Sequence, residues 1–470
     1  MKNDSQRVPF LEKISYGFGD LASVLYWQTF MLYFTFFYTD VFLIPPAAAA
    51  TMFLVSRIWD GINDPMMGMI ADRTQTRWGK FRPYLLWLCV PFAFVGVLTF
   101  TVPDFGTTGK LIWAYGTFIA IMMLYTAINI PYTALLGVIS ADSKERTTIS
   151  SVKFLFAFSA GIIVSATLLP LVKILGEGNE ARGWQLSFII YGIAAVVFFL
   201  IAFMGTRERV QPPKTQKSSV KQDLYELVTN VPWLILLGTT ITFILFVAVR
   251  SSVTVHYFKY VIGSQEITLP FFNPTKYEYD VLTSAFNTIG QISAFLGVLL
   301  VSWFAKMVGK KKAFLILLIL AIVTTSSFYF LTVEHLLWIF ILQIVGSLTG
   351  GPLSVLLWAM YADTADYGEW KRGRRTTGLV FSASTMSQKF GWAFGAYVAL
   401  ILMSQVGFEA NKAQSADSLQ GLLLLFSLIP ALLGILSLIF LMFYPLNENK
   451  VELITAELKA RRDESDEDIE

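Results

Sequence analysis

The stretch Leu135-Leu-Gly-Val-Ile-Ser-Ala-Asp142-Ser143 has a counterpart later in the chain, Leu356-Leu-Trp-Ala-Met-Tyr-Ala-Asp363-Thr364. A basic loop with the triplet Arg-Thr-Thr follows each stretch, at 146–148 and 375–377. An internal repeat of this kind indicates a chain built from two related halves. Apolar stretches of about 20 residues, long enough to cross a bilayer, surround both copies. They lie at about 13–40, 47–71, 83–103, 110–139, 150–175, 183–206, 231–262, 278–305, 312–332, 335–361, 375–406 and 418–445.

The composition is that of a polytopic membrane protein. Of the 470 residues, 55% are hydrophobic and only 15% are charged, whereas soluble proteins carry roughly 25% charged residues. We therefore predict an all-α membrane protein with twelve transmembrane helices and the major facilitator architecture, in which the ligand site lies at mid-membrane between the halves. The predicted segments are a six-helix half at 1–206, a cytoplasmic linker at 207–230, a second six-helix half at 231–446 and a cytoplasmic tail at 447–470.

The basic residues predict the orientation. Most of the 36 Lys and Arg residues fall in the loops that share a side with the N-terminus. Because cytoplasmic loops of membrane proteins are enriched in Lys and Arg, we expect both termini to be cytoplasmic in a multi-pass protein of the inner, or plasma, membrane.

Several function classes are disfavoured by what the sequence lacks. It has a single cysteine, Cys89, and two histidines, His256 and His335, too few for a disulfide framework or a histidine metal centre. No Ser/His/Asp set, zinc motif or phosphate loop is recognisable. We expect no enzyme activity, no cofactor apart from a coupling ion, no nucleic-acid partner and a monomer in the lipid bilayer.

Charged residues inside the second apolar stretch predict a cation site. The stretch Arg57-Ile-Trp-Asp60-Gly-Ile-Asn63-Asp64-Pro-Met66 contains one basic and two acidic residues. The spacing of Arg57, Asp60 and Asp64 places them near one helix face, with Asn63 beside them. Each charge at the bilayer centre costs about 2.5–3.5 kcal/mol on insertion scales. Carboxylate and amide oxygens can replace the hydration of Na⁺, or a carboxylate can take up H⁺. The alternative is an interhelical salt bridge that only holds the bundle together.

Lys389 lies far from either end of the eleventh apolar stretch, on one face with Thr385. Two acids and one lysine leave one net negative charge, which a single monovalent cation would neutralise. This arithmetic favours one Na⁺ or H⁺ per transport cycle, provided that the groups converge. The alternative is a lysine that neutralises an acid permanently.

The remaining substrate candidates are polar or aromatic residues in apolar stretches. In the fourth stretch Tyr125, Asn129 and Thr133 share a face next to Pro131, where they can bind a polyol or contact another helix. Arg250 can hold an anionic substrate, pair with a protein acid or extend to water. The full substrate-binding set is Asp20, Tyr26, Tyr125, Asn129, Thr133, Arg250, Thr385, Gln388, Lys389 and Trp392.

Charges in the cytoplasmic loops indicate an inter-half latch. Ion pairs that form in one access state and break in the other would bias the equilibrium between the states. The alternative is the ordinary excess of basic residues with incidental acids. The candidate gating charges are Asp142, Arg146, Asp363, Asp366, Glu369 and Arg375, with Glu145 beside them.

These residues resemble the glycoside–pentoside–hexuronide:cation symporter family, which includes the melibiose permeases. The matching motifs, in order from about 15 to 440, are Tyr16-Gly-Phe-Gly19, Phe37-Tyr-Thr-Asp40-Val, Arg57-Ile-Trp-Asp60 with Asn63-Asp64-Pro, Arg77-Trp-Gly-Lys80, Ile130-Pro131, Ala362-Asp363-Thr-Ala-Asp366-Tyr-Gly-Glu369 and Lys389. The resemblance implies uptake of a sugar with Na⁺ or H⁺ by alternating access. It also implies cation ligation at Asp60 and Asp64, with Asn63 and Thr126 nearby and Lys389 beside the site.

The chain departs from the melibiose permeases at three positions. They have acids where this chain has Val24 and Asn129, and a sugar-stacking Trp where it has Thr133. These differences argue against melibiose itself and leave Na⁺ and H⁺ both open. We predict a symporter for a sugar, glycoside or hexuronide. The alternatives are a sodium-coupled lysolipid symporter and a non-transporting membrane sensor of the same fold.

Overall fold

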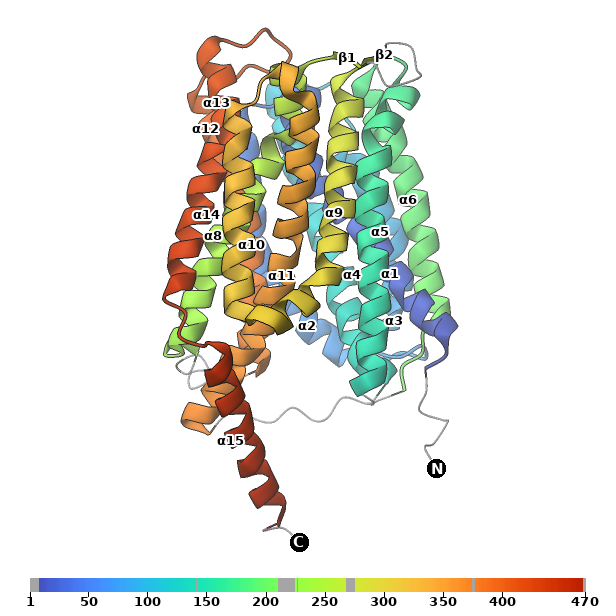
Figure 1. Cartoon of the computed structure of the whole chain (residues 1–470). Coiled ribbons are helices and arrows are strands. Elements are labelled where there is room, and N and C mark those ends of the chain that lie inside the picture. Colours follow the sequence, from blue (N-terminus) through green and yellow to red (C-terminus); the bar gives the residue numbers. More distant parts are fainter. Residues whose placement is uncertain are drawn as a thin grey trace. The chain divides into compact units, whose positions relative to one another are not determined.

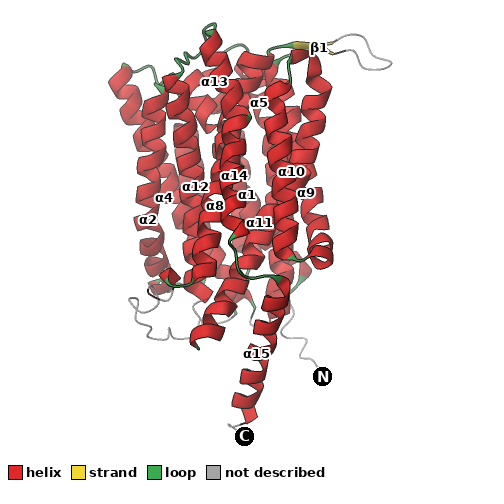
Figure 2. Ribbon diagram, turned by 60° about the vertical axis from the view of Figure 1, so that its left-hand side comes forward, coloured by secondary structure: helices red, strands yellow, loops and turns green. Residues whose placement is uncertain are grey.

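The structure, a computed structural model, describes residues 8–140, 143–209, 225, 227–267, 275–373 and 377–467. These residues form helices and one short antiparallel hairpin (Figures 1 and 2). The elements are α1 (Phe10–Phe36), η2 (Phe37–Val41), α2 (Pro46–Arg73), α3 (Arg82–Thr99), α4 (Thr107–Ile139), α5 (Ser143–Gly176), α6 (Glu180–Gly205), α8 (Val231–His256), η3 (Tyr257–Ile262), β1 (Gln265–Ile267), β2 (Thr275–Tyr277), α9 (Tyr279–Val308), α10 (Lys310–Ser327), η4 (Phe328–Phe330), η5 (Val333–His335), α11 (Leu336–Arg372), α12 (Thr377–Gln405), α13 (Ala416–Phe426), α14 (Leu428–Met442) and α15 (Glu448–Glu467).

The helices have the length and composition of membrane spans. In the described part of the chain, nine helical segments are long and apolar enough to cross a membrane. Three further helices, α1, α2 and α12, have 27, 28 and 29 residues, which also exceeds the length required, but they are not among these nine segments. The all-α membrane architecture is confirmed, while the number of twelve spans stays a prediction.

The chain divides into two compact units. Unit 1 comprises Met1–Lys214, Thr254–Thr288 and Leu400–Ser418, and unit 2 comprises Thr215–Val253, Ile289–Ala399 and Leu419–Glu470. Unit 1 therefore contains the first six long helices together with the end of α8, the hairpin, the start of α9, and the end of α12 with the loop that leads into α13. The division follows packing and not sequence repeats, so the predicted halves 1–206 and 231–446 stay a prediction.

Aromatic packing forms the core of unit 1. Tyr26 of α1 lies against Phe92 of α3 and Phe188 of α6, with ring centroids 4.3 and 5.5 Å away. Gly96 allows this approach, because a Cβ at that position would lie 2.3 Å from the Tyr26 ring. Near the start of α1, the rings of Tyr16 and Tyr132 stack with their centroids 4.6 Å apart. Each hydroxyl donates a hydrogen bond to the other residue's backbone carbonyl. These contacts fix α1 against α3, α4 and α6.

Ion pairs and a cap hold the segment after α6 against the starts of α1 and α3. The Glu208 carboxylate accepts hydrogen bonds from the backbone N–H groups of Lys80, Phe81 and Arg82, which satisfies donors at the start of α3. Arg209 donates through both terminal nitrogens to Glu12, at 2.7 Å each. The hydrogen bond to Glu12 raises the pKa of Arg209.

Unit 2 has its own apolar core and includes the C-terminal helix. α10 packs against α11 and α14, and α15 packs against the end of α11. Ile454 and Leu458 of α15 are buried, and the Trp370 indole donates to Glu457 at 2.6 Å. The described part of the predicted tail, up to residue 467, is therefore a helix that packs on unit 2.

Candidate functional site

The predicted cation-site residues lie on one face of α2. Asp60 is only 2% exposed, and Asn63 and Asp64 are half-buried. The helix begins with Pro46 at a position where the missing N–H costs nothing, and four alanines follow. An unbroken helix through 60–64 then brings these three side chains to one face. The side chain of Arg57, which we expected to orient the acids, lies outside the described residues.

Helix α4 supplies the fourth member of the set. The hydroxyl of Thr126, which is 3% exposed, donates to Oδ1 of Asp64 at 2.9 Å. Pro131 lies inside the same helix and has no N–H, so it cannot bond the carbonyl of Ala127 next to Thr126. The structure therefore brings together Asp64 of α2 and Thr126, which the family resemblance had placed near each other.

This donor set suits a small hard cation. Two carboxylates, one amide and one hydroxyl can each offer an oxygen ligand, and oxygen ligands are those that hard cations take in proteins. A carboxylate in a membrane helix can also take up a proton in place of a metal cation. Both Na⁺ and H⁺ fit these residues.

Trp27 of α1 and Tyr125 of α4, the residue before Thr126, form an aromatic platform. The ring of Tyr125 stacks on that of Trp27, with centroids 5.4 Å apart and an interplanar angle of 27°. Asn129 donates to the backbone carbonyl of Tyr125 at 3.0 Å, so one of its amide protons is already used. Thr133, one turn further along, is exposed. Tyr125, Asn129 and Thr133 thus lie on one side of α4, as their spacing predicted.

Two predicted substrate ligands on α1, Tyr26 and Asp20, have protein partners in this structure, and the role of Asp20 as a ligand stays a prediction. Tyr26 is completely buried in the aromatic core, so it lines no surface in this structure, and we leave it out of the site. Asp20 is 9% exposed, and its Oδ1 lies 3.5 Å from Nζ of Lys153 on α5. The residue of α1 that does reach the aromatic platform is Trp27, which sequence reasoning did not select because aromatic residues are common throughout this chain.

The candidates on α12 belong to unit 2. Gln388, Lys389 and Trp392 are half-buried, and Thr385 is exposed. Their spacing of three and four residues places them along one side of α12, as predicted. The charge arithmetic that joins Lys389 to Asp60 and Asp64 stays a prediction.

Arg250 has close partners inside unit 2. Its Nη2 donates to Oε1 of Gln343 at 3.1 Å. The guanidinium carbon lies 4.6 Å from the ring centroid of Phe328 and 4.7 Å from that of Phe426, distances at which cations and aromatic rings attract each other. A planar guanidinium between two rings and an amide favours the structural interpretation of Arg250 over the anion-binding one.

The predicted gating charges are only partly described. Asp142 and Arg375 lie outside the described residues. Asp363 is paired within unit 2, because Nζ of Lys310 lies 2.6 Å from its Oδ2 and 2.7 Å from its Oδ1. Arg146 is half-buried at the start of α5, and Asp366 and Glu369 are half-buried near the end of α11. For Asp363, the partner seen here is therefore a neighbouring helix of its own unit and not the other half.

The described geometry combines acids on α2, a hydroxyl on α4 and an aromatic platform. Comparison with known proteins places the chain in a family. A sequence model described as MFS/sugar transport protein matches residues 15–448. The chain belongs to this family. The isoprimeverose transporter of Lactiplantibacillus pentosus is 36% identical over 460 residues, covering 95% of this chain and 91% of the relative. The inner membrane symporter YicJ of Escherichia coli K12 is 34% identical over 449 residues, covering 95% of this chain and 94% of the relative.

Solved structures confirm the fold of this sugar transport family member. The crystal structure of the nucleoside transporter NupG matches with a TM-score of 0.65 at 12% sequence identity, covering 93% of this chain and 100% of NupG. The expected resemblance to glycoside–pentoside–hexuronide:cation symporters and the major facilitator fold are thus confirmed. The protein is a multi-pass membrane transporter that works by symport, and it is not an enzyme.

For this transporter we expect Arg250→Gln to reduce stability without changing substrate preference. The substitution removes the charge that lies between Phe328 and Phe426, an interaction of about 0.5–2 kcal/mol. The melting temperature of the purified protein should therefore fall, and the relative inhibition of uptake by neutral glycosides and hexuronides should stay the same. Arg250→Lys is the matched variant, since it keeps the charge and loses the planar group. A loss of hexuronide preference with unchanged melting would show that Arg250 binds an anionic substrate.

Proposed function

We propose that this transporter couples the inward movement of one monovalent cation, Na⁺ or H⁺, to the uptake of a saccharide by alternating access. The cation binds at Asp60, Asn63, Asp64 and Thr126. The saccharide binds beside it, against the platform of Trp27 and Tyr125 and the polar residues Asn129 and Thr133. In unit 2 the proposed saccharide ligands are the α12 residues Thr385, Gln388, Lys389 and Trp392.

One observation supports the proposal more than any other: a nearly buried carboxylate, Asp60, one turn from a second carboxylate that is bound by Thr126. Two acids on one membrane helix are costly without a compensating cation. A structural salt bridge requires only one of them. A site that is stabilised whenever a cation enters provides a free-energy link between the ion and the conformation of the protein.

The coupling follows from linkage between two adjacent sites. If the cation raises the affinity for sugar, the sugar raises the affinity for the cation by the same factor, typically about 5–150-fold, or about 1–3 kcal/mol. Asp60 and Asp64 carry the cation, and Asn129 and Thr133 lie one and two turns from Thr126 on α4. A shared helix is a short path for such coupling.

The substrate class rests on the relatives and on the aromatic platform. One relative is named an isoprimeverose transporter, and we propose a saccharide of that kind. A sugar ring can stack on an aromatic ring while its hydroxyl groups bond to polar side chains. Stacked Trp27 and Tyr125 with neighbouring Asn129 provide both kinds of contact.

The proposed setting is the inner membrane, with both termini cytoplasmic and the protein acting as a monomer. The excess of Lys and Arg in the loops on the side of the N-terminus supports the orientation. A relative named an inner membrane symporter supports the location. Many large apolar side chains are exposed on the helices, among them Ile193, Trp303 and Leu337, as expected for surfaces in contact with lipid.

The substrate proposal is tested by counterflow in vesicles that contain only the purified protein. Vesicles loaded with one unlabelled saccharide are diluted into a trace of the same labelled saccharide, over a panel of neutral glycosides, pentosides and hexuronides. We expect protein-dependent counterflow for at least one saccharide, with reduced counterflow in the Trp27→Ala variant. An absence of counterflow across the whole panel, from protein that remains folded in detergent, would contradict the proposal.

A further inference from the structure

Asp40, a carboxylate that the proposed transport site does not use, has polar partners at both of its oxygens. Asp40 follows α1, at the end opposite to the start of that helix, and is 3% exposed. Its Oδ2 lies 2.7 Å from the Thr39 hydroxyl and 3.0 Å from Nε2 of His256. Its Oδ1 accepts from Nζ of Lys259 at 2.9 Å and from the Tyr260 hydroxyl.

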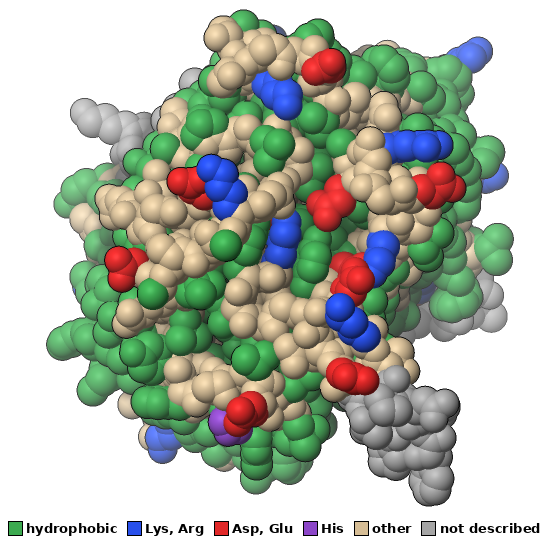
Figure 3. Space-filling view, turned by 90° about the horizontal axis from the view of Figure 1, so that it is seen from above, with side chains coloured by type: hydrophobic (Ala, Val, Ile, Leu, Met, Phe, Trp, Pro, Cys, Tyr) green, Lys and Arg blue, Asp and Glu red, His purple; other side chains and the backbone are tan. Residues whose placement is uncertain are grey.

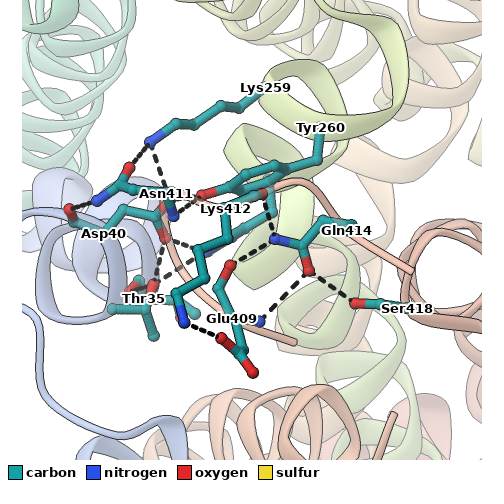
Figure 4. Close-up of polar contacts among 11 residues, drawn as sticks. Thr35, Asp40, Lys259, Tyr260, Glu409, Asn411, Lys412, Gln414 and Ser418 are labelled. Carbon is teal, nitrogen blue, oxygen red and sulfur yellow. Dashed lines mark hydrogen bonds and ion pairs between the residues drawn. The ribbon is translucent and has the colours of Figure 1, made fainter. Parts of the chain in front are cut away.

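A third segment of the chain joins the same cluster (Figure 4). The Asn411 amide nitrogen donates to the backbone carbonyl of Asp40 at 2.7 Å, and its side-chain oxygen accepts from Lys259 at 2.6 Å. The backbone N–H of Asn411 donates to the hydroxyl of Tyr260 at 2.8 Å. Asp40 thus connects the end of α1, the end of α8 with η3, and the loop between α12 and α13.

The backbone at two of these segments is unusual in the same way. Asp40 lies in the π-helical turn η2, and Lys259 and Tyr260 lie in the π-helical turn η3. Short π-helical turns are rare in proteins, and those that do occur are frequently located at functional sites. Both turns begin with two aromatic residues and include a Val, in Phe37-Tyr-Thr-Asp-Val41 and Tyr257-Phe-Lys-Tyr-Val261, and each ends the first long helix of its predicted half. The cluster therefore joins equivalent helix ends of the two predicted halves.

A second set of contacts near the first also joins residues of the first predicted half to residues of the second. Nζ of Lys173, at the end of α5, lies 2.7 Å from Glu278 and 3.3 Å from Asp280, at the start of α9. The Tyr279 hydroxyl donates to Glu180 at the start of α6 at 3.0 Å. Lys259 lies over the rings of Phe36 and Tyr279, 5.0 and 5.6 Å from their centroids. Figure 3 shows acidic and basic side chains next to each other on the face at this end of the molecule.

We propose that Asp40 is the centre of an outer latch, formed by Asp40, His256, Lys259, Tyr260 and Asn411, which must open for substrate to enter from outside. The proposal rests on the proposed alternating access and on both termini being cytoplasmic, which puts the end of α1 at the outer surface. Lys173 with Glu278 and Asp280 acts as a second, more exposed contact of the same latch.

The chemistry of the cluster suits a contact that opens and closes. In a buried ion pair, the cost of removing the charges from water offsets most of their attraction, so such a pair specifies geometry more than it adds stability. When the segments separate, Asp40 and Lys259 regain hydration. An apolar contact of similar area has no such compensation, because water does not stabilise the exposed surface. The latch therefore fixes one arrangement while keeping the opening reversible.

The cluster also favours a transition between two arrangements, one closed and one fully open, without a stable intermediate. Asp40 has donors at both carboxylate oxygens, so loss of one donor leaves a buried charge with reduced compensation. Partial opening is then less favourable than either the closed or the fully hydrated arrangement. A two-state element of this kind is what a cation or sugar bound elsewhere can bias.

The test measures how accessible a sealed residue is from outside. Ser284 lies one turn after Asp280 on α9 and is 5% exposed. In a background where Cys89, the only cysteine, is replaced by alanine, Ser284→Cys provides a single reporter. Its reaction with a membrane-impermeant maleimide, added outside to vesicles of known orientation without sugar, is followed over time.

We expect Asp40→Asn to raise the initial labelling rate several-fold, and Lys259→Met and Asn411→Ala to raise it less. The double variant Asp40→Asn/Lys259→Met should label more slowly than the sum of the single effects predicts, since each single variant leaves its partner uncompensated. Glu409→Gln is the matched control. It removes a carboxylate from the same loop that pairs with Lys412 in an exposed bridge, and it should leave labelling unchanged.

Labelling separates failure of the latch from failure of the proposed function, because it requires no transport. If Asp40→Asn does not fold, the Lys259→Met and Asn411→Ala variants carry the test. Unchanged labelling in these folded variants, or an equal increase with Glu409→Gln, would overturn the latch, whether or not the protein accumulates sugar.

Discussion

Replacing Asp60 by Asn is expected to abolish accumulation of sugar against its gradient while leaving the protein folded and downhill exchange measurable. Asn keeps the size of the side chain and removes the charge that a cation compensates. Asp64→Asn should have the same effect, and it retains a group that can accept a hydrogen bond from Thr126. Without the site the cation gradient no longer drives uptake, so internal sugar should rise only to the external concentration. The cation should also no longer raise the apparent affinity for sugar by the typical factor of about 5–150. The measurement is uptake of labelled sugar driven by an imposed cation gradient in vesicles.

Asp104→Asn is the matched control for these variants. Asp104 is exposed in the loop between α3 and α4, so the same chemical change there should leave accumulation intact. Full cation-stimulated accumulation in both Asp60→Asn and Asp64→Asn would show that the acids of α2 only hold the helices together.

Removal of Lys389 is expected to impair transport and to change its dependence on pH. If Lys389 compensates an acid of the cation site, Lys389→Ala leaves that acid without its positive partner. Loss of a nearby positive charge favours the protonated form of an acid, so the acid of the variant should bind H⁺ at higher pH. Uptake should fall by about tenfold, equivalent to a loss of about 1.4 kcal/mol, and stimulation by Na⁺ should weaken relative to that by H⁺.

The pH profile distinguishes this role from a purely structural one. Lys389→Arg should restore part of the wild-type profile, because it keeps the positive charge. Lys306→Ala changes an exposed lysine at the end of α9 and should leave the profile unaltered. If Lys389→Ala reduces uptake equally at every pH and Na⁺ concentration, Lys389 contributes only to the structure of unit 2.

The architecture was predictable because it depends on properties that a sequence displays directly. Apolar length identifies spans, and the repeated stretches at 135–143 and 356–364 indicate duplication. The site on α2 was predictable for a related reason. A regular helix turns a spacing of three and four residues into a face, so Asp60, Asn63 and Asp64 had to lie together.

Contacts between helices were less accessible to sequence reasoning. Thr126 as the partner of Asp64 came only from the family resemblance, since no local pattern relates α2 to α4. Tyr26 and Asp20 were selected as ligands because an aromatic and an acid in a membrane helix are frequently functional. Their surroundings, an aromatic core and Lys153, are determined by which side of α1 faces α3, α5 and α6.

The Asp40 cluster was missed for the same physical reason. Phe37-Tyr-Thr-Asp-Val41 belongs to the motifs shared with the family, yet its partners His256, Lys259 and Asn411 are more than two hundred residues away in the sequence. The available sequence signal was an acid at the end of the first apolar stretch and one of only two histidines at the end of the seventh.

The central claim, that a cation gradient drives sugar uptake through the site on α2, is tested most directly by one measurement. Purified protein in sealed vesicles receives labelled sugar under an inward Na⁺ gradient or an inward H⁺ gradient, imposed separately. The account predicts a transient rise of internal sugar above its equilibrium level with at least one of the gradients, and no such rise with Asp60→Asn. Equilibration without any rise under both gradients, in vesicles that do exchange sugar, would contradict it.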